Sequence, residues 1–297
     1  MDRIFNVFKP KGPTSHDVVA RLRRGSGIRR IGHAGTLDPI AEGVLIVAIG
    51  RATRVIEYLT ETDKAYRAHI TFGVETDTYD AEGRVVAERP AGHLTREAVA
   101  DALSPFRGTI QQRPPAFSAI SVGGQRLYDL ARRGQTVDVP TREVEIRTLE
   151  LEAWKPPVAV VFVECSKGTY IRSLAYDLGQ VLGVGAHLSG LTRTRVGSFS
   201  SASAVPLEQL EQALREGRGV EAGVSPDQAI DFLPAIRLDA EVAGRLTNGI
   251  AVQPSGVIPH RLGTLARAYG PDDDFLAVVR LEQVHGQPAW RPEKVFG

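Results

Sequence analysis

The amino-acid sequence predicts an α+β fold in two parts, a large domain over residues 1–231 and a small β domain over residues 232–297. In the first part, apolar or alternating segments typical of strands are interleaved with segments whose apolar residues recur at helical spacing. From about Phe232 the pattern changes to short strands separated by many turns. The chain has 297 residues, of which 42% are hydrophobic, so it can bury a substantial core.

The first sixty residues predict two strands and two helices. Residues 4–8 have the length and apolar content of a short strand, and Ser15 can cap a helix that ends near Arg24. The continuous apolar run GVLIVAIG at 43–50 is typical of a buried strand, and the apolar spacing within 52–60 indicates a second helix.

The rest of the chain continues to mix the two signals. In KAYRAHITFG, Tyr66 shares one face with three apolar residues while polar residues occupy the other, which predicts a strand with one buried face. Thr95 can cap a helix that ends near Leu103. Strands are expected at 143–152 and 158–165, an amphipathic helix at 166–183, an acidic helix and loop at 206–231, and strands of the small domain within 233–239, 249–254 and 275–284.

Charge is unevenly distributed along the sequence, although the formal net charge is only +1. Residues 1–33 hold eight Lys or Arg and two acidic residues, and residues 107–147 hold seven and four. Residues 206–231 reverse this balance, with six acidic residues and two arginines. Such segregation favours a groove that binds a polyanion, whereas the alternative is a set of solvated faces.

Several classes of protein receive no support from the sequence. The single cysteine, Cys165, rules out an intramolecular disulfide and suits a reducing cytoplasm. The seven histidines show no metal-ligand spacing, and neither GxxxxGK[ST] nor GxGxxG occurs. No apolar run reaches the roughly 20 residues of a membrane span, and the N-terminus does not have the pattern of a signal peptide. We therefore expect a cytoplasmic protein without a metal or a nucleotide cofactor.

The stretch GHAGTLDPIAEGVL at 32–45 places His33 and Asp38 in a loop of small residues. An aspartate before a proline is commonly a turn residue. Here, however, the small neighbours allow another chain to approach closely, and the strand that follows anchors the loop on a rigid element. Asp38 is therefore a candidate catalytic carboxylate. His33 is either an exposed loop imidazole or a flat ring that stacks on or displaces a base.

Arg172 is a second candidate, because it lies in the first turn of its expected helix, where a cation opposes the helix dipole. An anionic partner, either a phosphate or a buried carboxylate such as Asp38, would offset this cost, and the alternative is a solvated arginine. Four other side chains are, taken alone, most simply packing or surface residues: Tyr66, Tyr170, Leu191 and Lys9.

Five segments that occur in order over residues 6–200 carry a family resemblance: FKPKGPTSHDVV, GHAGTLDPIAEGVL, KAYRAHITFG, RPPAFSAISVGGQRLYDLARRG and SKGTYIRSLAYDLG. Together they resemble the motifs of the TruB family, the bacterial tRNA pseudouridine-55 synthases. The C-terminal part, ending PAWRPEKVFG, resembles a PUA RNA-binding domain more loosely. The sequence departs from the family pattern at Phe8, where an aspartate is usual, and at Ala34 and Glu42, where threonines are common.

The resemblance implies a pseudouridine-synthase fold, with a mixed, largely antiparallel central sheet flanked by helices and a small C-terminal PUA domain that resembles a β-barrel. An RNA-clamp insertion is implied at about 117–140, within a catalytic domain of residues 1–231. The family's site roles fall on seven residues: the nucleophile Asp38, the base-stacking Tyr66, Arg172 as partner of the catalytic carboxylate, His33 in the space left by flipped bases, Tyr170 and Leu191 in the uracil pocket, and Lys9 in support of the site wall.

The implied reaction isomerises uridine-55 in the T loop of tRNA, breaking the C1′–N1 bond and forming a C1′–C5 bond after the base has left its stack. Asp38, kept ionised by Arg172, either attacks the anomeric carbon or removes a sugar proton through a glycal. No cofactor is implied, and we expect a monomer that needs no guide RNA, obligate protein partner or membrane. Two alternatives stay open: a non-catalytic RNA-binding protein, and the guide-RNA-dependent relative that works in a ribonucleoprotein.

Overall fold

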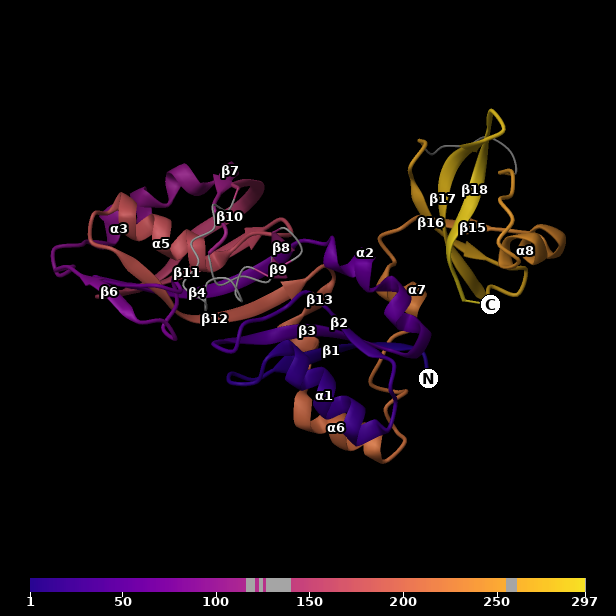
Figure 1. The fold of residues 1–297 in the computed structure, drawn as a ribbon, viewed down its shortest axis with the longest axis horizontal. Helices are drawn as coiled ribbons and strands as arrows, with labels where there is room; N and C mark the ends of the chain where they lie inside the picture. Colours follow the sequence, from indigo (N-terminus) through magenta and orange to yellow (C-terminus); the bar gives the residue numbers. More distant parts are fainter. Residues whose placement is uncertain (116–120, 123–124, 127–139, 255–260, 297) are drawn as a thin grey trace.

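The computed structural model describes residues 1–115, 121–122, 125–126, 140–254 and 261–296. A ten-stranded sheet runs through the larger part of the molecule, and a four-stranded sheet lies beside it (Figure 1). The large sheet has the order β14-β1-β3-β12-β4-β11-β10-β7, with β2 paired to β3 and β13 paired to β12. Its strands are β1 (Arg3–Lys9), β2 (Ile31–Ala34), β3 (Ala41–Ile49), β4 (Lys64–Phe72), β7 (Gly108–Gln112), β10 (Arg142–Lys155), β11 (Val158–Cys165), β12 (Ala186–Val196), β13 (Phe199–Ser200) and β14 (Val205–Pro206).

The large sheet is mixed and largely antiparallel, as expected. Only β1–β14 and β3–β12 pair in parallel, whereas its other neighbouring strands run antiparallel. Two small hairpins lie outside it: β5 (Val74–Thr76) with β6 (Val85–Glu88), and β8 (Ser121–Val122) with β9 (Gln125–Arg126). The parallel pair β3–β12 is important for the site, because it sets Leu191 opposite Ala41 and Arg193 opposite Gly43.

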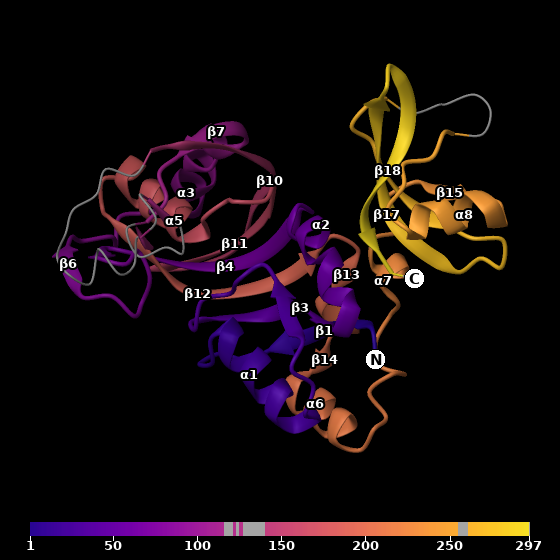
Figure 2. The same ribbon diagram turned by 45° about the vertical axis from the view of Figure 1, so that its right-hand side comes forward.

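Helices cover the two halves of the large sheet (Figures 1 and 2). Leu22 of α1 and Leu210 of α6 pack against one face of β1 and β3, in a buried cluster that includes Phe5 and Leu45. At the other end of the sheet, α3 and α5 share a second cluster with β4, β10 and β11. Within the described residues, the helices are α1 (Ser15–Ser26), α2 (Ile56–Thr60), α3 (Arg96–Ala102), α5 (Ile171–Val181), α6 (Leu207–Arg215), α7 (Pro226–Ala229) and α8 (Ala240–Thr247), with 3-10 turns η1 (Gly50–Val55), η2 (Ser104–Phe106) and η3 (Ser201–Ser203).

Strand β4 confirms the alternation predicted from the sequence. Tyr66, Ala68, Ile70 and Phe72 are buried, whereas Arg67 and His69 are exposed. Because successive side chains of a strand point to opposite faces, one register fixes the direction of the whole segment. Tyr66 is thereby committed to the interior.

Two N-terminal predictions need correction. The N-cap of α1 is Thr14 and not Ser15, because Thr14 and Asp17 form a reciprocal capping box in which each side chain bonds the other's backbone N–H. The segment expected as one helix at 52–60 divides into the 3-10 turn η1 and the short helix α2. The helix predicted from Thr95 is confirmed, since the Thr95 hydroxyl accepts from the N–H of Ala98.

The C-terminal part forms a four-stranded sheet of β15 (Ala235–Arg237), β16 (Leu265–Tyr269), β17 (Phe275–Val284) and β18 (Gln287–Val295). Residues 249–254 were expected to form a strand, but they contribute only an isolated bridge from Val252 to Trp290. The helix α8 was not predicted at all. Asp239 caps it by accepting from the N–H of Val242.

The two parts of the chain contact each other through α2, β1 and β3 on one side and β17 and β18 on the other. Phe296 and Val278 pack with Ile4 in one buried cluster. The hydroxyl of Tyr58 donates to Glu293 over 2.9 Å, and Lys294 pairs with Glu57 at 2.8 Å. Figures 1 and 2 show the small sheet beside α2 in both views.

The expected RNA clamp at about 117–140 lies outside the described residues, apart from β8, β9 and Pro140. No helix in the described part of the chain is long and apolar enough to cross a membrane.

Candidate active site

The loop that carries Asp38 joins β2 to β3 and is held by main-chain hydrogen bonds. The N–H of Ala41 donates to the carbonyl of Asp38 over 3.0 Å, which closes the bend before β3 begins. The N–H of Gly12 donates to the carbonyl of Pro39 over 2.9 Å, so the segment after β1 ties down the other side. The Asp38 backbone is therefore fixed by neighbours on both sides.

Ser15 fixes the same loop from the start of α1. Its buried hydroxyl accepts from the N–H of Leu37 over 2.8 Å and donates to the carbonyl of Leu37 over 3.2 Å. Since Thr14 supplies the helix cap, the Ser15 side chain is available for this contact. One side chain thus satisfies both main-chain groups of the residue before Asp38.

Replacing Ser15 with alanine leaves the buried N–H and carbonyl of Leu37 without this partner. We expect Ser15→Ala to lower the free energy of unfolding by about 1–3 kcal/mol, measured by chemical denaturation. Lys11→Ala, at an exposed neighbouring position, is the control and should change it by less than about 0.5 kcal/mol. A Ser15→Ala variant as stable as this control would show that the hydroxyl does not hold the loop.

Arg193 of β12 also holds the β2–β3 loop that carries Asp38. It is 1% exposed, and its guanidinium donates to the carbonyls of Gly35 (3.0 Å), Thr36 (3.3 Å) and Val44 (2.7 Å). Arg193 fits closely against β3 because residue 43 is glycine: a Cβ there would lie 2.3 Å from the Arg193 carbonyl oxygen. Arg193 also stands opposite Tyr66 in the pairing of β12 with β4, so it links the loop to β4.

A single guanidinium joins two carboxylates at the centre of the site. Nε of Arg172 lies 3.0 Å from Oδ2 of Asp38, and its Nη1 lies 3.3 Å from Oδ2 of Asp80. The side chains of Arg172 and Asp80 are 8% and 5% exposed, whereas that of Asp38 is 38% exposed. Asp80 also accepts from the hydroxyl of Thr78 (2.6 Å) and the N–H of Glu82 (3.1 Å). Arg172 is therefore a buried ion-pair partner and not a solvated arginine.

Burial raises the pKa of Asp38 above its usual range. The charge of Arg172 opposes this shift, as expected, but it does not outweigh the loss of water, and the nearby carboxylate of Asp80 adds to the increase in the pKa. Arg172 therefore lowers the pKa of Asp38, as expected from its charge. Its effect is smaller than that of burial, so the net shift of this pKa is upward. Although its side chain is partly exposed, Asp38 is thus a more basic carboxylate than an aspartate surrounded by water.

A cavity of about 1040 Å³ opens above these groups, a volume typical of sites that enclose small ligands. Five of the seven predicted site residues line it, namely Asp38, Tyr66, Tyr170, Arg172 and Leu191. The other lining residues come from segments 35–39, 60–64, 78–82, 140–143 and 166–171 and from Arg193. The fold thus brings together residues from six separate stretches of chain.

The aromatic and apolar walls of the cavity are rigidly placed. Burial raises the pKa of Tyr66 to about 12, so its hydroxyl stays protonated beside Arg193. Tyr170 precedes α5, and both its N–H (2.7 Å) and its carbonyl (2.9 Å) bond the side-chain amide of Gln112, which is 1% exposed. Leu191 is buried on β12, opposite Ala68 of β4.

Lys9 and His33 are not among the residues that line this cavity. Lys9 is completely buried, and its ammonium donates to the carbonyls of Pro10 (2.9 Å) and Pro13 (2.8 Å), while burial lowers its pKa to about 8. His33 lies on β2 with its ring edge-on to His16 at 5.3 Å, and burial lowers its pKa to about 4. Their predicted roles in binding the substrate stay predictions.

Sequence reasoning missed Asp80 and Arg193. Arg193 could have been found, because it is two residues from Leu191 on the same strand and therefore shares its inward face. Asp80 gave no such signal: it follows Tyr79, whose positive φ of 64° belongs to a turn, and its partner Arg172 is 92 residues away.

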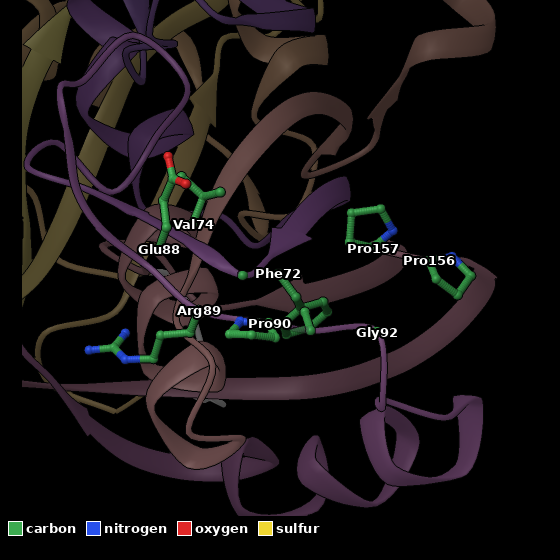
Figure 3. A pocket seen from close by; sticks show the side chains of 10 residues that line it. Phe72, Val74, Glu88, Arg89, Pro90, Gly92, Pro156 and Pro157 are labelled. Atoms are coloured by element: carbon green, nitrogen blue, oxygen red, sulfur yellow. The ribbon is translucent and has the colours of Figure 1, made fainter.

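A second hollow, of about 640 Å³, lies at the end of β4, between the β5–β6 hairpin and the β10–β11 turn (Figure 3). Phe72 and Pro90 face the turn at Pro156 and Pro157, and none of the predicted site residues lines this hollow.

Within the described residues, no group of three or more His, Cys, Asp or Glu side chains is placed to hold a metal ion.

The sequence was compared with protein-family models and with known proteins, and the matches belong to one family. Residues 23–171 match the model of the TruB family pseudouridylate synthase N-terminal domain, and residues 172–229 match that of the tRNA pseudouridylate synthase B C-terminal domain. The chain is 51% identical over 254 residues to the tRNA pseudouridine synthase B of Symbiobacterium thermophilum, covering 84% of this chain and 83% of that protein. It is 41% identical over 296 residues to the protein of the same name from Dehalococcoides mccartyi strain CBDB1, covering 100% and 97%.

The fold comparison agrees with the sequence comparison. A chain in the structure of an H/ACA ribonucleoprotein bound to a substrate RNA containing 2′-deoxyuridine superimposes with a TM-score of 0.75 at 26% identity, covering 99% of this chain and 85% of that one. Family models, relatives and fold lead to one conclusion: the chain is a pseudouridylate synthase that belongs to the TruB family.

Proposed function

We propose that this protein converts uridine-55 in the T loop of tRNA to pseudouridine. The observation that carries the proposal is the Asp38–Arg172 ion pair on the wall of the cavity, beside Tyr66, Tyr170 and Leu191. The names of the relatives from Symbiobacterium and Dehalococcoides support tRNA as the substrate. The basic segment at residues 1–33 supports a polyanionic partner.

In the proposed reaction, the C1′–N1 bond of uridine breaks, a C1′–C5 bond forms, and a proton passes from C5 to N1. No atom is gained or lost and nothing is oxidised. Asp38 acts at the ribose, either by attack on the anomeric carbon or by removal of a sugar proton through a glycal. Either role requires the ionised carboxylate, and the Arg172 guanidinium at 3.0 Å holds it in place.

The target base must leave its stack to reach Asp38, because the carboxylate lies inside the cavity. Extrusion of a base costs a few kcal/mol. Stacking on Tyr66 or Tyr170 would return roughly 1–3 kcal/mol for each base–aromatic contact. In this proposal His33, which lies outside the cavity beside His16, fills the space that the flipped base leaves in the RNA.

The pH dependence of the reaction depends on Asp80. Its negative charge raises the pKa of Asp38, so the uncharged variant Asp80→Asn should lower that pKa. Since the ionised form is the active one, activity falls as pH decreases through this pKa. We therefore expect the acid limb of kcat/KM to move to lower pH in Asp80→Asn, measured as a pH–rate profile. A limb that stays in place or moves to higher pH would contradict this coupling.

We also propose how the remaining parts of the chain contribute. Residues 232–297 act as a PUA-like RNA-binding domain, attached to a catalytic domain of residues 1–231 by the contacts of β17 and β18. The segment at about 117–140 clamps the RNA. The protein works in the cytoplasm as a monomer, without a guide RNA or an obligate protein partner, as the bacterial relatives named tRNA pseudouridine synthase B suggest.

A T-arm hairpin incubated with the purified protein alone tests this function. We expect pseudouridine at the position equivalent to 55, and none when that uridine is replaced by cytidine. Binding without conversion would contradict the proposal and favour a non-catalytic RNA-binding protein. Conversion only after a guide RNA is added would favour a ribonucleoprotein enzyme.

A further inference from the structure

Arg142, which lines the cavity, differs in its pairing from two other cations, Arg147 and Lys167. Arg147, on the same strand, pairs with Asp63 and with Glu145, and Lys167 pairs with Glu61. Among the described residues, Arg142 has no carboxylate partner and makes no side-chain hydrogen bond. Its guanidinium instead lies over the ring of Tyr170, with Cζ 5.5 Å from the ring centroid. Arg142 is therefore a cation that lines the cavity with its N–H groups available to a ligand.

The backbone of Tyr170, whose ring lies under Arg142, is held in place. The buried amide of Gln112 bonds both main-chain groups of Tyr170, which fixes the start of α5 relative to the end of β7. An arginine stacked on an aromatic face keeps its in-plane N–H fork free, and that fork matches the geometry of a phosphate. The Tyr170 platform thus pre-organises the Arg142 guanidinium at the mouth of the cavity, which reduces the cost of ordering it on binding.

The charges inside the cavity indicate why such a cation is needed. Four carboxylates line it, from Asp38, Asp80, Glu82 and Glu143. Arg172 is engaged by Asp38 and Asp80, and Arg193 by main-chain carbonyls, so neither is available to compensate an incoming anion. A nucleotide of an RNA strand that enters the cavity carries one phosphate on its 5′ side and one on its 3′ side. These phosphates would lie at the mouth, where the strand enters and leaves.

We propose that Arg142 binds a backbone phosphate adjacent to the flipped nucleotide and so forms a phosphate subsite at the mouth of the cavity. This inference rests on the proposed function, because it requires a flipped nucleotide of an RNA strand. Arg142 is a binding residue that positions the substrate and does not touch the reacting atoms.

Replacement of Arg142 separates charge from packing. Arg142→Met keeps an apolar side chain over Tyr170 without the charge, and Arg142→Lys keeps the charge. For Arg142→Met we expect KM for a T-arm hairpin to rise about tenfold, with kcat within about twofold and the slope of log KM against log salt reduced by about one. Arg142→Lys should recover part of the loss. The matched control Arg147→Gln, a paired cation on the same strand, should change KM by less than about twofold.

Neutral linkages in the RNA identify the phosphate itself. Hairpins with a single methylphosphonate at each linkage around the target are compared by Kd and by turnover, with the wild type, Arg142→Met and Arg147→Gln. A methylphosphonate at one particular linkage should raise Kd about tenfold for the wild type and for Arg147→Gln. The same replacement should leave the Kd of Arg142→Met almost unchanged.

The proposal would be overturned if, at every linkage, the methylphosphonate raised Kd by the same factor in Arg142→Met as in the wild type. It would also be overturned if Arg142→Met and Arg142→Lys bound the hairpin equally well. The subsite is decided by Kd alone. Absence of pseudouridine with the wild type would instead contradict the proposed function.

Discussion

Asp38→Asn is expected to reduce the rate of pseudouridine formation by at least about 10⁴-fold, the scale of loss found when a nucleophile is removed. Asparagine is nearly isosteric, and the loop around residue 38 is held by Ser15, Gly12 and Arg193, so the fold should persist. The Kd for tRNA should change by less than about threefold, because the phosphate contacts are untouched. Single-turnover rates and equilibrium binding on the same transcript measure both quantities.

Glu82→Gln is the control for Asp38→Asn, because Glu82 is another carboxylate on the cavity wall. It should keep the rate within about tenfold of the wild type. Full activity of Asp38→Asn, or equal losses in the two variants, would remove Asp38 from its assigned role.

Arg172→Met is the second change with a large expected effect. It leaves Asp38 and Asp80 without the cation between them, and Asp80 is buried, so we expect a loss of about 3 kcal/mol in the free energy of unfolding. The rate should fall on the order of 100-fold or more. Because Arg172 lowers the pKa of Asp38, its removal should move the acid limb of kcat/KM to higher pH, opposite to the shift in Asp80→Asn. Denaturation and pH–rate profiles test these effects.

The double variant Arg172→Met with Asp80→Asn checks the physical cause. It removes the buried charge that the single variant leaves uncompensated, so part of the lost stability should return. If the double variant were less stable than Arg172→Met by the full cost of Asp80→Asn, the two side chains would be energetically independent. That result would contradict the shared ion pair.

Local rules predicted those parts of the fold that depend on neighbours in sequence. The alternation of KAYRAHITFG placed Tyr66 inside, and Thr95 marked the start of α3 correctly. The same rules misplaced the cap of α1, because both Thr14 and Ser15 suit that position and only the three-dimensional contact with Leu37 decides between them. Helix α8 was missed because it has few apolar residues. They are buried only by packing against the small sheet, which is not visible in the local sequence.

The site shows a similar division. The position of Arg172 against its own helix dipole predicted an anionic partner, and Asp38 is in that place. Asp80 could not be predicted, since its pairing with Arg172 requires the turn at Tyr79 to meet α5, which is far away in the sequence. The inward direction of Arg193 follows from its spacing to Leu191, but its carbonyl partners could not be predicted, because Gly35 lies in the β2–β3 loop and Val44 in β3.

Mapping of pseudouridine along a complete tRNA transcript tests the central claim most directly. The unmodified transcript is treated with the purified wild-type protein or with Asp38→Asn, without guide RNA, and every uridine is read. We expect one pseudouridine, at position 55, with the wild type, and none with Asp38→Asn. Modification at another position only, or an unchanged product with Asp38→Asn, would contradict the account.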